Sequence, residues 1–500
     1  MEDSLKKRYS IKLLASVVSG LIGIILVAIV PKALGPVSFG QFSYLQQFFA
    51  QIIAFLDAGT STAFFTKLSA RNGRKELILF YALFSGFLLF VLILLFVFAD
   101  YFSYLESSLP NIPLQYIYLG LGFGYLSWLL QIFIKISDAY ALTVSVEIIK
   151  IIHKIFSLLL LLVLVNYYVL DLERYFYFNY FVLILFIGIT SVLFVKKGIF
   201  TRGSWSLRLD YKKLVKEFTK YTTPLFIFNI VGIFVGLFDI WLLQKVSGSI
   251  ETGFYGLAYS IAAMCFLFTG AMTPIITREF SKSFAENDID KIRSLFQRYI
   301  PMLYAIAAYF GVFIAFQSEN LLYIFTDDKF KEAYFALVIM AFYPLHQTYG
   351  QLSASLFFAS ENTRQYKNIG IIVSFIGLLF SLVLVYILEL GAVGFAWKMV
   401  LVQIISVNIQ VFYNTKYLKI SFLPFVKHQI YTIVFFSMFA FLSYLVSNNL
   451  ESHLWSFLIS GAMYSILVIV GIFYFPQVMA LKKDELFKNL RQLKWKVKNG

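Results

Sequence analysis

The sequence predicts an all-α polytopic membrane protein with about fourteen transmembrane helices. Its 500 residues are 60% hydrophobic and only 14% charged, whereas soluble domains carry about 25% charged residues. Apolar runs of about 20 residues, long enough to cross a hydrocarbon core of about 30 Å, recur along the whole chain. The stretches between these runs are too short for a soluble domain of ordinary size.

We place the spans at approximately 11–31, 42–66, 77–99, 114–134, 143–165, 176–195, 221–244, 254–277, 299–318, 333–358, 369–388, 394–413, 431–447 and 454–474. An even number of spans puts both termini on one side of the membrane. The loops of the opposite side then hold few basic residues, namely Lys32, Arg174, Lys245, Lys329 and Lys331. The positive-inside rule therefore predicts that both termini are cytoplasmic.

The formal net charge of +15 does not indicate nucleic acid as a partner. Lys and Arg are spread among short loops and form no single basic face. The one cysteine, Cys265, lies in an apolar run and can form neither an intrachain disulfide nor a cysteine metal cluster. No Gly-x4-Gly-Lys-Ser/Thr loop occurs, so direct use of ATP by this chain is not expected. We therefore expect no cofactor and no metal.

The external loops are short, and the longest are 100–113 and 319–332. A polymerase, a ligase or a lipid-linked glycosyltransferase would need larger external loops with paired acids, or Arg and His, for acid–base chemistry. We therefore expect a carrier without catalytic residues.

A short glycine pattern occurs once in each half of the chain. Gly35 and Gly40 enclose four residues before a span that ends near Lys67, and Gly248 and Gly253 do the same before a span that ends near Arg278. This recurrence predicts two six-helix lobes related as a parallel repeat, a known transporter plan with the substrate site between the halves. The predicted organisation is an N-terminal lobe 1–195, a cytoplasmic linker 196–220, a C-terminal lobe 221–413, two further helices within 414–474 and a basic cytoplasmic tail 475–500.

Several motifs resemble one family in their order and spacing over essentially the whole chain. They are Leu34-Gly35-Pro36 to Gly40, Asp57-Ala58-Gly59 followed by Lys67, Pro224-Leu225, Asp239, Gly253-Phe254-Tyr255, Pro274 to Arg278, and Gly391 to Gly394. In these features the chain resembles the polysaccharide exporters and O-antigen (Wzx-like) flippases of the MOP superfamily, which also includes the lipid II flippase and the MATE multidrug carriers.

The resemblance implies the MOP fold and a function. Members move a polyprenyl-diphosphate-linked oligosaccharide, of the undecaprenyl type, across the bacterial inner membrane by alternating access. This substrate would be an O-antigen or another surface-polysaccharide repeat unit, moved with coupling to an ion gradient or the membrane potential. A polymerase and a chain-length regulator are implied as partners, besides membrane lipids. A lipid II flippase and a MATE-type cation antiporter are the alternatives.

A diphosphate brought toward an apolar medium needs cations to replace its water. Our candidates for such a cationic cavity are Lys12, Lys67, Arg71, Lys150, Lys154 and Arg278. The alternative for those at helix ends is anchoring at the lipid interface. Lys150 and Lys154 share a helical stripe with Glu147 and His153, so an internal salt-bridge ladder is the alternative there.

Acidic residues within spans are costly and are functional candidates for that reason. Asp57, Asp239 and Glu147 are our candidates for binding a coupling ion. Helix capping or a structural hydrogen bond is the alternative for the two aspartates. Lys398 and His346 are further polar residues within spans, and a single histidine is more often a satisfied interior group.

Overall fold

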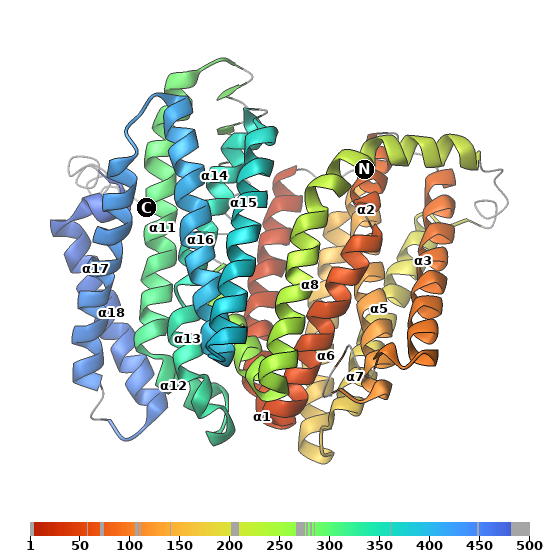
Figure 1. Ribbon diagram of the computed structural model, residues 1–500, viewed down its shortest axis with the longest axis horizontal. Coiled ribbons are helices and arrows are strands. Elements are labelled where there is room, and N and C mark those ends of the chain that lie inside the picture. Colours follow the sequence, from red (N-terminus) through yellow and green to blue (C-terminus); the bar gives the residue numbers. More distant parts are fainter. Residues whose placement is uncertain are drawn as a thin grey trace, which may run out of the picture. The chain divides into compact units, whose positions relative to one another are not determined.

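The chain is helical throughout the part that the structure describes (Figure 1). The computed structural model describes residues 5–481 except 58, 71–74, 106–108, 110–111, 141, 202–209, 267–275, 277–278, 281–282, 285, 361 and 448–449. The described residues contain no strand, as expected of a chain whose backbone groups must be satisfied within lipid. The predicted all-α fold class is confirmed.

Eleven described helices are long and apolar enough to cross a membrane. Two of them, α1 (Leu5–Asp57) and α8 (Tyr211–Ala263), contain a non-helical glycine, at Gly35 and Gly248, and each glycine lies between two predicted spans. Another predicted span is divided between the short helices α13 and α14. Most of the predicted spans thus have a described counterpart, whereas residues 267–275 and 277 of the predicted span 254–277 lie outside the described residues.

The chain divides into two compact units, residues 1–253 and 254–500. The first unit holds most of α8 besides the helices before it, which are α1, α2 (Thr60–Ala70), α3 (Lys75–Tyr101), α5 (Leu114–Ala139), α6 (Thr143–Tyr167) and α7 (Leu172–Lys196). The seventh span thus packs with the first unit. The division into lobes at 195 and 220 stays a prediction.

Aromatic side chains form much of the core of the first unit. Phe64 of α2 stacks on Tyr81 of α3 with ring centroids 4.4 Å apart, and both belong to a cluster that also includes Phe186 and Phe218. Bulky apolar residues such as Phe90 on α3 are exposed. Because lipid solvates such side chains, their exposure is what a membrane span requires.

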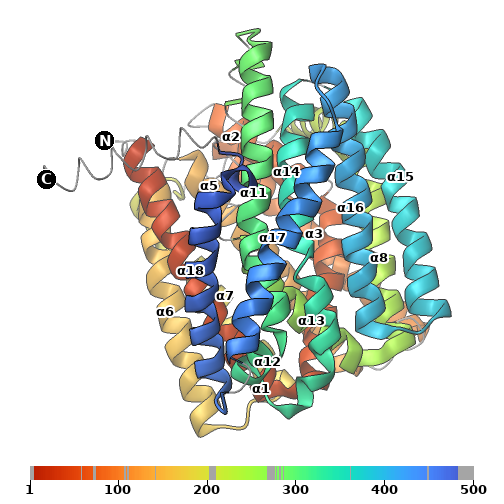
Figure 2. The same ribbon diagram turned by 90° about the vertical axis from the view of Figure 1, so that its left-hand side faces the viewer.

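The second unit contains the end of α8 and the helices that follow it (Figure 2). They are α11 (Ile289–Phe316), α12 (Ser318–Phe325), η2 (Asp328–Ala333), α13 (Tyr334–Met340), α14 (Tyr343–Ala359), α15 (Thr363–Ser381), the π-helical η3 (Leu382–Ile387), α16 (Gly391–Leu418), α17 (Leu423–Ser447), α18 (His453–Tyr474) and η4 (Pro476–Met479). The break between α13 and α14 coincides with Pro344 in the first turn of α14, where proline ends the preceding helical path.

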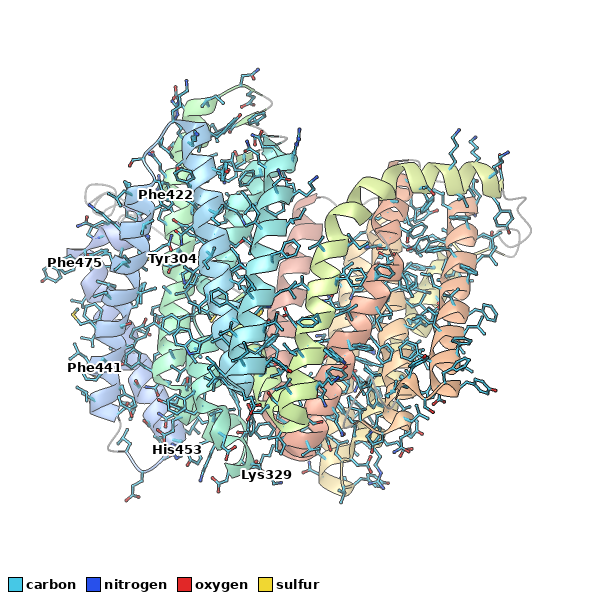
Figure 3. The ribbon with its side chains drawn as sticks, in the orientation of Figure 1. Tyr304, Lys329, Phe422, Phe441, His453 and Phe475 are labelled. Carbon is cyan, nitrogen blue, oxygen red and sulfur yellow. The ribbon has the colours of Figure 1, made fainter. Side chains whose placement is uncertain are left out.

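The core of the second unit combines aromatic packing with buried polar contacts (Figure 3). Tyr304 of α11 is fully buried, with its ring 5.2 Å from that of Tyr349. Near the other end of α11, Gln317 donates to Ser460 Oγ at 2.8 Å, and Asn320 donates to Gln317 Oε1 at 2.8 Å. His453 Nδ1 lies 2.8 Å from Asn320 Oδ1. These bonds tie α12 to α18.

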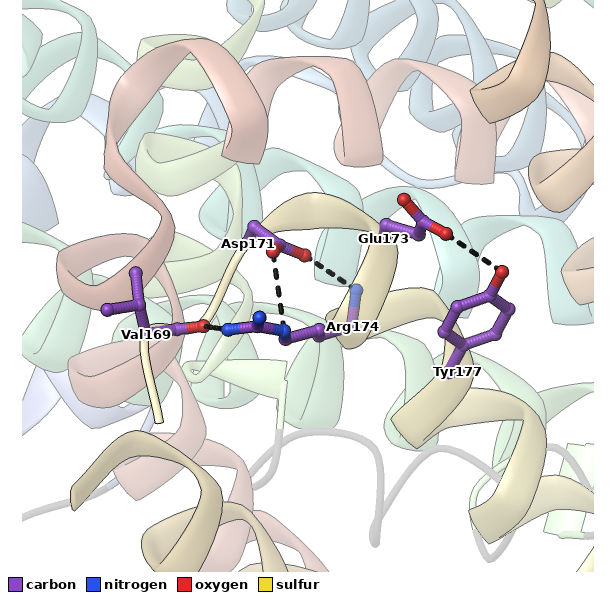
Figure 4. Close-up of polar contacts among 5 residues, drawn as sticks. All are labelled: Val169, Asp171, Glu173, Arg174 and Tyr177. Atoms are coloured by element: carbon purple, nitrogen blue, oxygen red, sulfur yellow. Dashed lines mark hydrogen bonds and ion pairs between the residues drawn. The ribbon is translucent and has the colours of Figure 1, made fainter. Parts of the chain in front are cut away.

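The start of α7 shows how a span begins in this chain (Figure 4). Asp171 is the N-cap, and its carboxylate accepts a hydrogen bond of 2.8 Å from the backbone N–H of Arg174. The Arg174 guanidinium donates to the backbone oxygen of Val169 at 2.6 Å, and Tyr177 donates to Glu173 at 2.9 Å. The cap accepts a hydrogen bond from one of the first backbone N–H groups of α7, which have no acceptor within the helix.

Candidate functional site

The two predicted glycine turns have the same backbone geometry. Gly35 has φ 73° and ψ 170°, and Gly248 has φ 80° and ψ −176°. A side chain would strain both conformations, because positive φ is rare for residues with a Cβ atom. Each turn therefore reverses the chain between two spans at the position that the repeat predicts.

The second glycine of each turn lies against the backbone of the other turn. A Cβ atom added to Gly40 would stand 1.7 Å from the oxygen of Ser249, and one added to Gly253 would stand 2.4 Å from the oxygen of Pro36. The contact is reciprocal, because the sixth residue of each Gly-x4-Gly segment meets the carbonyl of the second residue of the other. The two glycine turns thus contact each other within the first unit.

The pattern of the repeat is longer than two glycines. Lys32 precedes Gly35 by three residues, and Lys245 precedes Gly248 by three. The ammonium of Lys245 lies 4.7 Å from the centroid of the Trp241 ring, within cation–π range. Aligning the two turns in the sequence could have found this lysine, which our sequence reasoning treated only as a loop charge.

Asp57 lies at the junction between α1 and α2, at the end of the α1 segment that follows Gly35. Its Oδ1 accepts hydrogen bonds from the Ser61 backbone at 3.0 Å, from Thr60 Oγ1 at 2.7 Å and from the Tyr81 hydroxyl at 3.0 Å, and its Oδ2 accepts from Ser61 Oγ at 2.8 Å. Gly59 has φ 80°, which breaks the helix. Asp57 therefore caps α2, and the predicted continuous span 42–66 is interrupted here.

Two lysines lie near this junction. Lys135 of α5 donates to Ser61 Oγ at 2.7 Å, so a cation is connected to the Asp57 carboxylate through one hydroxyl. Lys67 of α2 is half-buried, with its ammonium 5.9 Å from the centroid of the Phe218 ring. Sequence reasoning proposed Lys67 but missed Lys135, whose place near the end of an apolar run resembles that of many interfacial lysines.

The polar stripe on α6, which consists of Glu147, Lys150, His153 and Lys154, contains one ion pair and two residues outside it. Glu147 is buried and forms an ion pair of 3.3 Å with Lys150. Lys154 lies one helical turn further, and no described carboxylate pairs with it. His153 Nε2 lies 2.7 Å from the Val182 backbone oxygen of α7. The expected ladder thus has one ion pair among the described residues.

A pocket of about 210 Å³ adjoins this stripe. Its walls come from α1, α5, α6 and α7, and its polar lining includes Lys150, His153, Lys154, Ser157 and Asn179. The described lining contains no acid. The pocket lies on Leu130 and Ile134 of α5, whereas Lys135 of the same helix contacts the Asp57 junction.

The remaining candidates occupy separate places. Asp239 lies in the segment of α8 that precedes Gly248, and its side chain is buried, with 6% of its surface exposed. In the second unit, Lys398 of α16 is buried with its ammonium 5.2 Å from the Phe395 ring centroid. His346 is buried beside Tyr304, with ring centroids 5.6 Å apart.

Arg71 and Arg278 lie outside the described residues, as does the side chain of Lys12. Among the described residues, no group of three His, Cys, Asp or Glu side chains is placed to hold a metal ion.

The fold and these sites define a class of protein. It is a multi-pass helical membrane protein with two glycine turns in reciprocal contact and with ionisable side chains buried inside its spans. Ionisable side chains buried within spans are candidates for function, because their burial in a membrane is costly.

The chain belongs to the polysaccharide biosynthesis protein family, whose model matches residues 5–280, more than half of the sequence. A search of curated proteins gave no match.

Solved structures are similar to this fold. A lipid II flippase, MurJ, in an inward closed conformation has a TM-score of 0.66 at 15% identity, and the match covers 93% of this chain and 98% of that one. An inward-facing MATE-family multidrug resistance transporter has a TM-score of 0.57 at 15% identity, covering 84% and 96%. An outward-facing MATE transporter has 0.56 at 13%, covering 83% and 94%. The predicted MOP fold is confirmed.

Proposed function

We propose that this protein is a flippase that moves a polyprenyl-diphosphate-linked oligosaccharide across the bacterial inner membrane, with both termini in the cytoplasm. The family supports a role in polysaccharide biosynthesis. The observation that carries the proposal is the set of lysines within the membrane-spanning first unit, namely Lys67, Lys135, Lys150 and Lys154.

Lysine in these places suits an anionic substrate. A diphosphate loses its hydration when it enters the membrane, and ammonium groups replace the lost water with charge-assisted hydrogen bonds. Lys67 would receive the diphosphate together with Arg71, Lys12 and Arg278, which we retain as expected contributors. Movement would follow alternating access driven by an ion gradient or the membrane potential, with Asp57, Asp239 and Glu147 as ion-binding candidates.

The proposed substrate is an O-antigen or another surface-polysaccharide repeat unit. A polymerase and a chain-length regulator would act on it after transfer, as partners in the same export route. Lipid II transport is a second candidate, because MurJ has a similar fold over 93% of this chain. Both substrates share a diphosphate, so the choice between them depends on the sugar.

Reconstitution in liposomes tests the proposal. The purified protein is assayed for transbilayer movement of a labelled polyprenyl-diphosphate oligosaccharide, of lipid II and of a cationic dye, with and without proton and sodium gradients. We expect movement of the oligosaccharide lipid and a loss of at least tenfold in Lys67→Met. The exposed lysine Lys197 at the end of α7 provides a matched control, Lys197→Met, expected to retain activity.

Each alternative predicts a different result. Preferred movement of lipid II would assign the second candidate. Movement of the dye without movement of either glycolipid would contradict the proposal and favour a cation antiporter, with Asp57 and Asp239 as the residues to examine.

A further inference from the structure

We propose that the pocket between α1, α5, α6 and α7 is a binding site for the phosphate group of a membrane lipid, held by Lys154 together with Lys150. On α5 the pocket is lined by Leu130 and Ile134, whereas the next residue, Lys135, is not part of the lining and donates to Ser61 at the Asp57 junction. The inference shares Lys150 and Lys154 with the proposed function, but it concerns binding and is tested without a transport assay.

The first argument is the depth of the Lys154 ammonium within its span. Lys154 is the eleventh residue of the span Val144–Tyr167, so about 15 Å of helix separate it from the beginning of that span. A lysine side chain cannot extend over this distance to water, and an ammonium at mid-span is costly without a partner. Since no described carboxylate pairs with Lys154, a bound anion would supply the missing charge.

The second argument is the composition of the pocket. Its described lining includes two lysines and no acid, and like charges four residues apart on a helix repel each other. Glu147 occupies one side of Lys150 at 3.3 Å, which leaves further ammonium N–H donors on Lys150 and those of Lys154. An anion between the two lysines would accept these donors and remove their repulsion.

The third argument concerns which anion fits. The pocket of about 210 Å³ is many times larger than the roughly 10–15 Å³ that a single water needs, so a group with several oxygens fits in it. Phosphate oxygens are strong acceptors for such donors. Ser157 and Asn179 already donate to backbone oxygens at 2.7 Å, so the lysines are the main donors toward a ligand.

The surroundings indicate a lipid as the source of the phosphate. An apolar groove of about 430 Å³ lies on α6 and α7 and shares His153 with the pocket. Its wall includes Ile152, 63% exposed, and Phe156, 43% exposed. A cationic pocket beside an apolar groove matches a molecule that joins a phosphate to hydrocarbon chains.

Binding to the delipidated full-length protein in a neutral detergent tests the site. The probes are phosphatidylglycerol, a polyprenyl diphosphate, inorganic phosphate, and diacylglycerol as the phosphate-free control. Native mass spectrometry measures binding, and thermal unfolding measures stabilisation, which grows with ligand concentration above Kd. We expect the lipid phosphates to bind and diacylglycerol to have no effect.

Four variants make the assignment specific. Lys154→Gln is expected to weaken binding by about tenfold or more, equivalent to about 1.4 kcal/mol, and Lys154→Arg is expected to restore most of it. Lys197→Gln removes one exposed positive charge from the same unit and is expected to bind as the wild type does. Glu147→Gln frees Lys150 and is expected to strengthen binding, which gives a test even if Lys154→Gln does not fold.

The possible outcomes distinguish which molecule supplies the bound phosphate. Tighter binding of the polyprenyl diphosphate would make the pocket a substrate site, and preference for phosphatidylglycerol would make it a site for a bilayer lipid. Binding of inorganic phosphate alone would show a phosphate site without a lipid and overturn the lipid assignment. Equal binding by the wild type and Lys154→Gln would overturn the site itself, whatever the flippase assay shows.

Discussion

Replacing Gly40 by alanine tests the reciprocal contact between the two glycine turns. The new Cβ would stand 1.7 Å from the Ser249 oxygen, whereas ordinary contact begins at 3.4 Å. The two backbones must therefore separate by about 1.7 Å, because neither atom belongs to a flexible side chain. Overpacking of this kind costs about 1–3 kcal/mol.

The penalty applies only while the two turns touch. A cost of about 1–3 kcal/mol shifts an equilibrium between touching and separated states by about 5-fold to 150-fold. We therefore expect Gly40→Ala to lower the Tm and to favour states in which the turns are apart. Gly253→Ala is expected to act in the same direction, since its Cβ would stand 2.4 Å from the Pro36 oxygen.

Cysteine labelling measures the separation. Ser249 is 7% exposed and Cys265 is the only native cysteine, so Ser249→Cys in a Cys265→Ser background provides one reporter thiol beside Gly40. We expect a membrane-impermeant maleimide to label this thiol at least about fivefold faster in Gly40→Ala.

Gly23 provides the matched control. It also lies on α1, but a Cβ added there meets no atom within 4 Å, so Gly23→Ala is expected to leave labelling unchanged. Equal Tm and equal labelling in Gly40→Ala and Gly23→Ala would refute the proposed close contact.

Two further predictions concern buried polar contacts. Asp57→Ala removes the cap of α2 and the acceptor of the Ser61 backbone N–H and hydroxyl, so we expect a loss of about 1–3 kcal/mol in unfolding free energy, measured as a lower Tm. An unchanged Tm would contradict the capping role. Asn320→Leu removes the partner of His453 and Gln317 and is expected to cost about 1–3 kcal/mol in the same measurement. An unchanged Tm in Asn320→Leu would argue against the network.

The sequence alone was sufficient for the fold class and for the location of most spans. The reason is that a hydrocarbon core sets the length of an apolar run, so composition and length predict a span without knowledge of its neighbours. The two glycine turns were also predictable, because Gly35 and Gly248 recur in the same pattern and their positive φ is accessible mainly to glycine.

Breaks within spans were harder to predict. The interruption at Asp57 and Gly59 lies in an otherwise apolar run, and its local signal is one acid before a glycine. The break before α14 does have a sequence signal in Pro344, which favours a helix start at that point. A hydropathy average over the length of a span does not reveal either break, because each break is only a few residues long.

The tertiary structure decided which partners the charged residues have. Helical spacing placed Glu147, Lys150 and Lys154 on one stripe but could not show that Glu147 pairs with Lys150 while Lys154 faces a pocket. It also could not connect Lys135 to Ser61, which is 74 residues away. Periodicity determines the face on which a side chain lies, whereas its partner depends on which helix packs against that face.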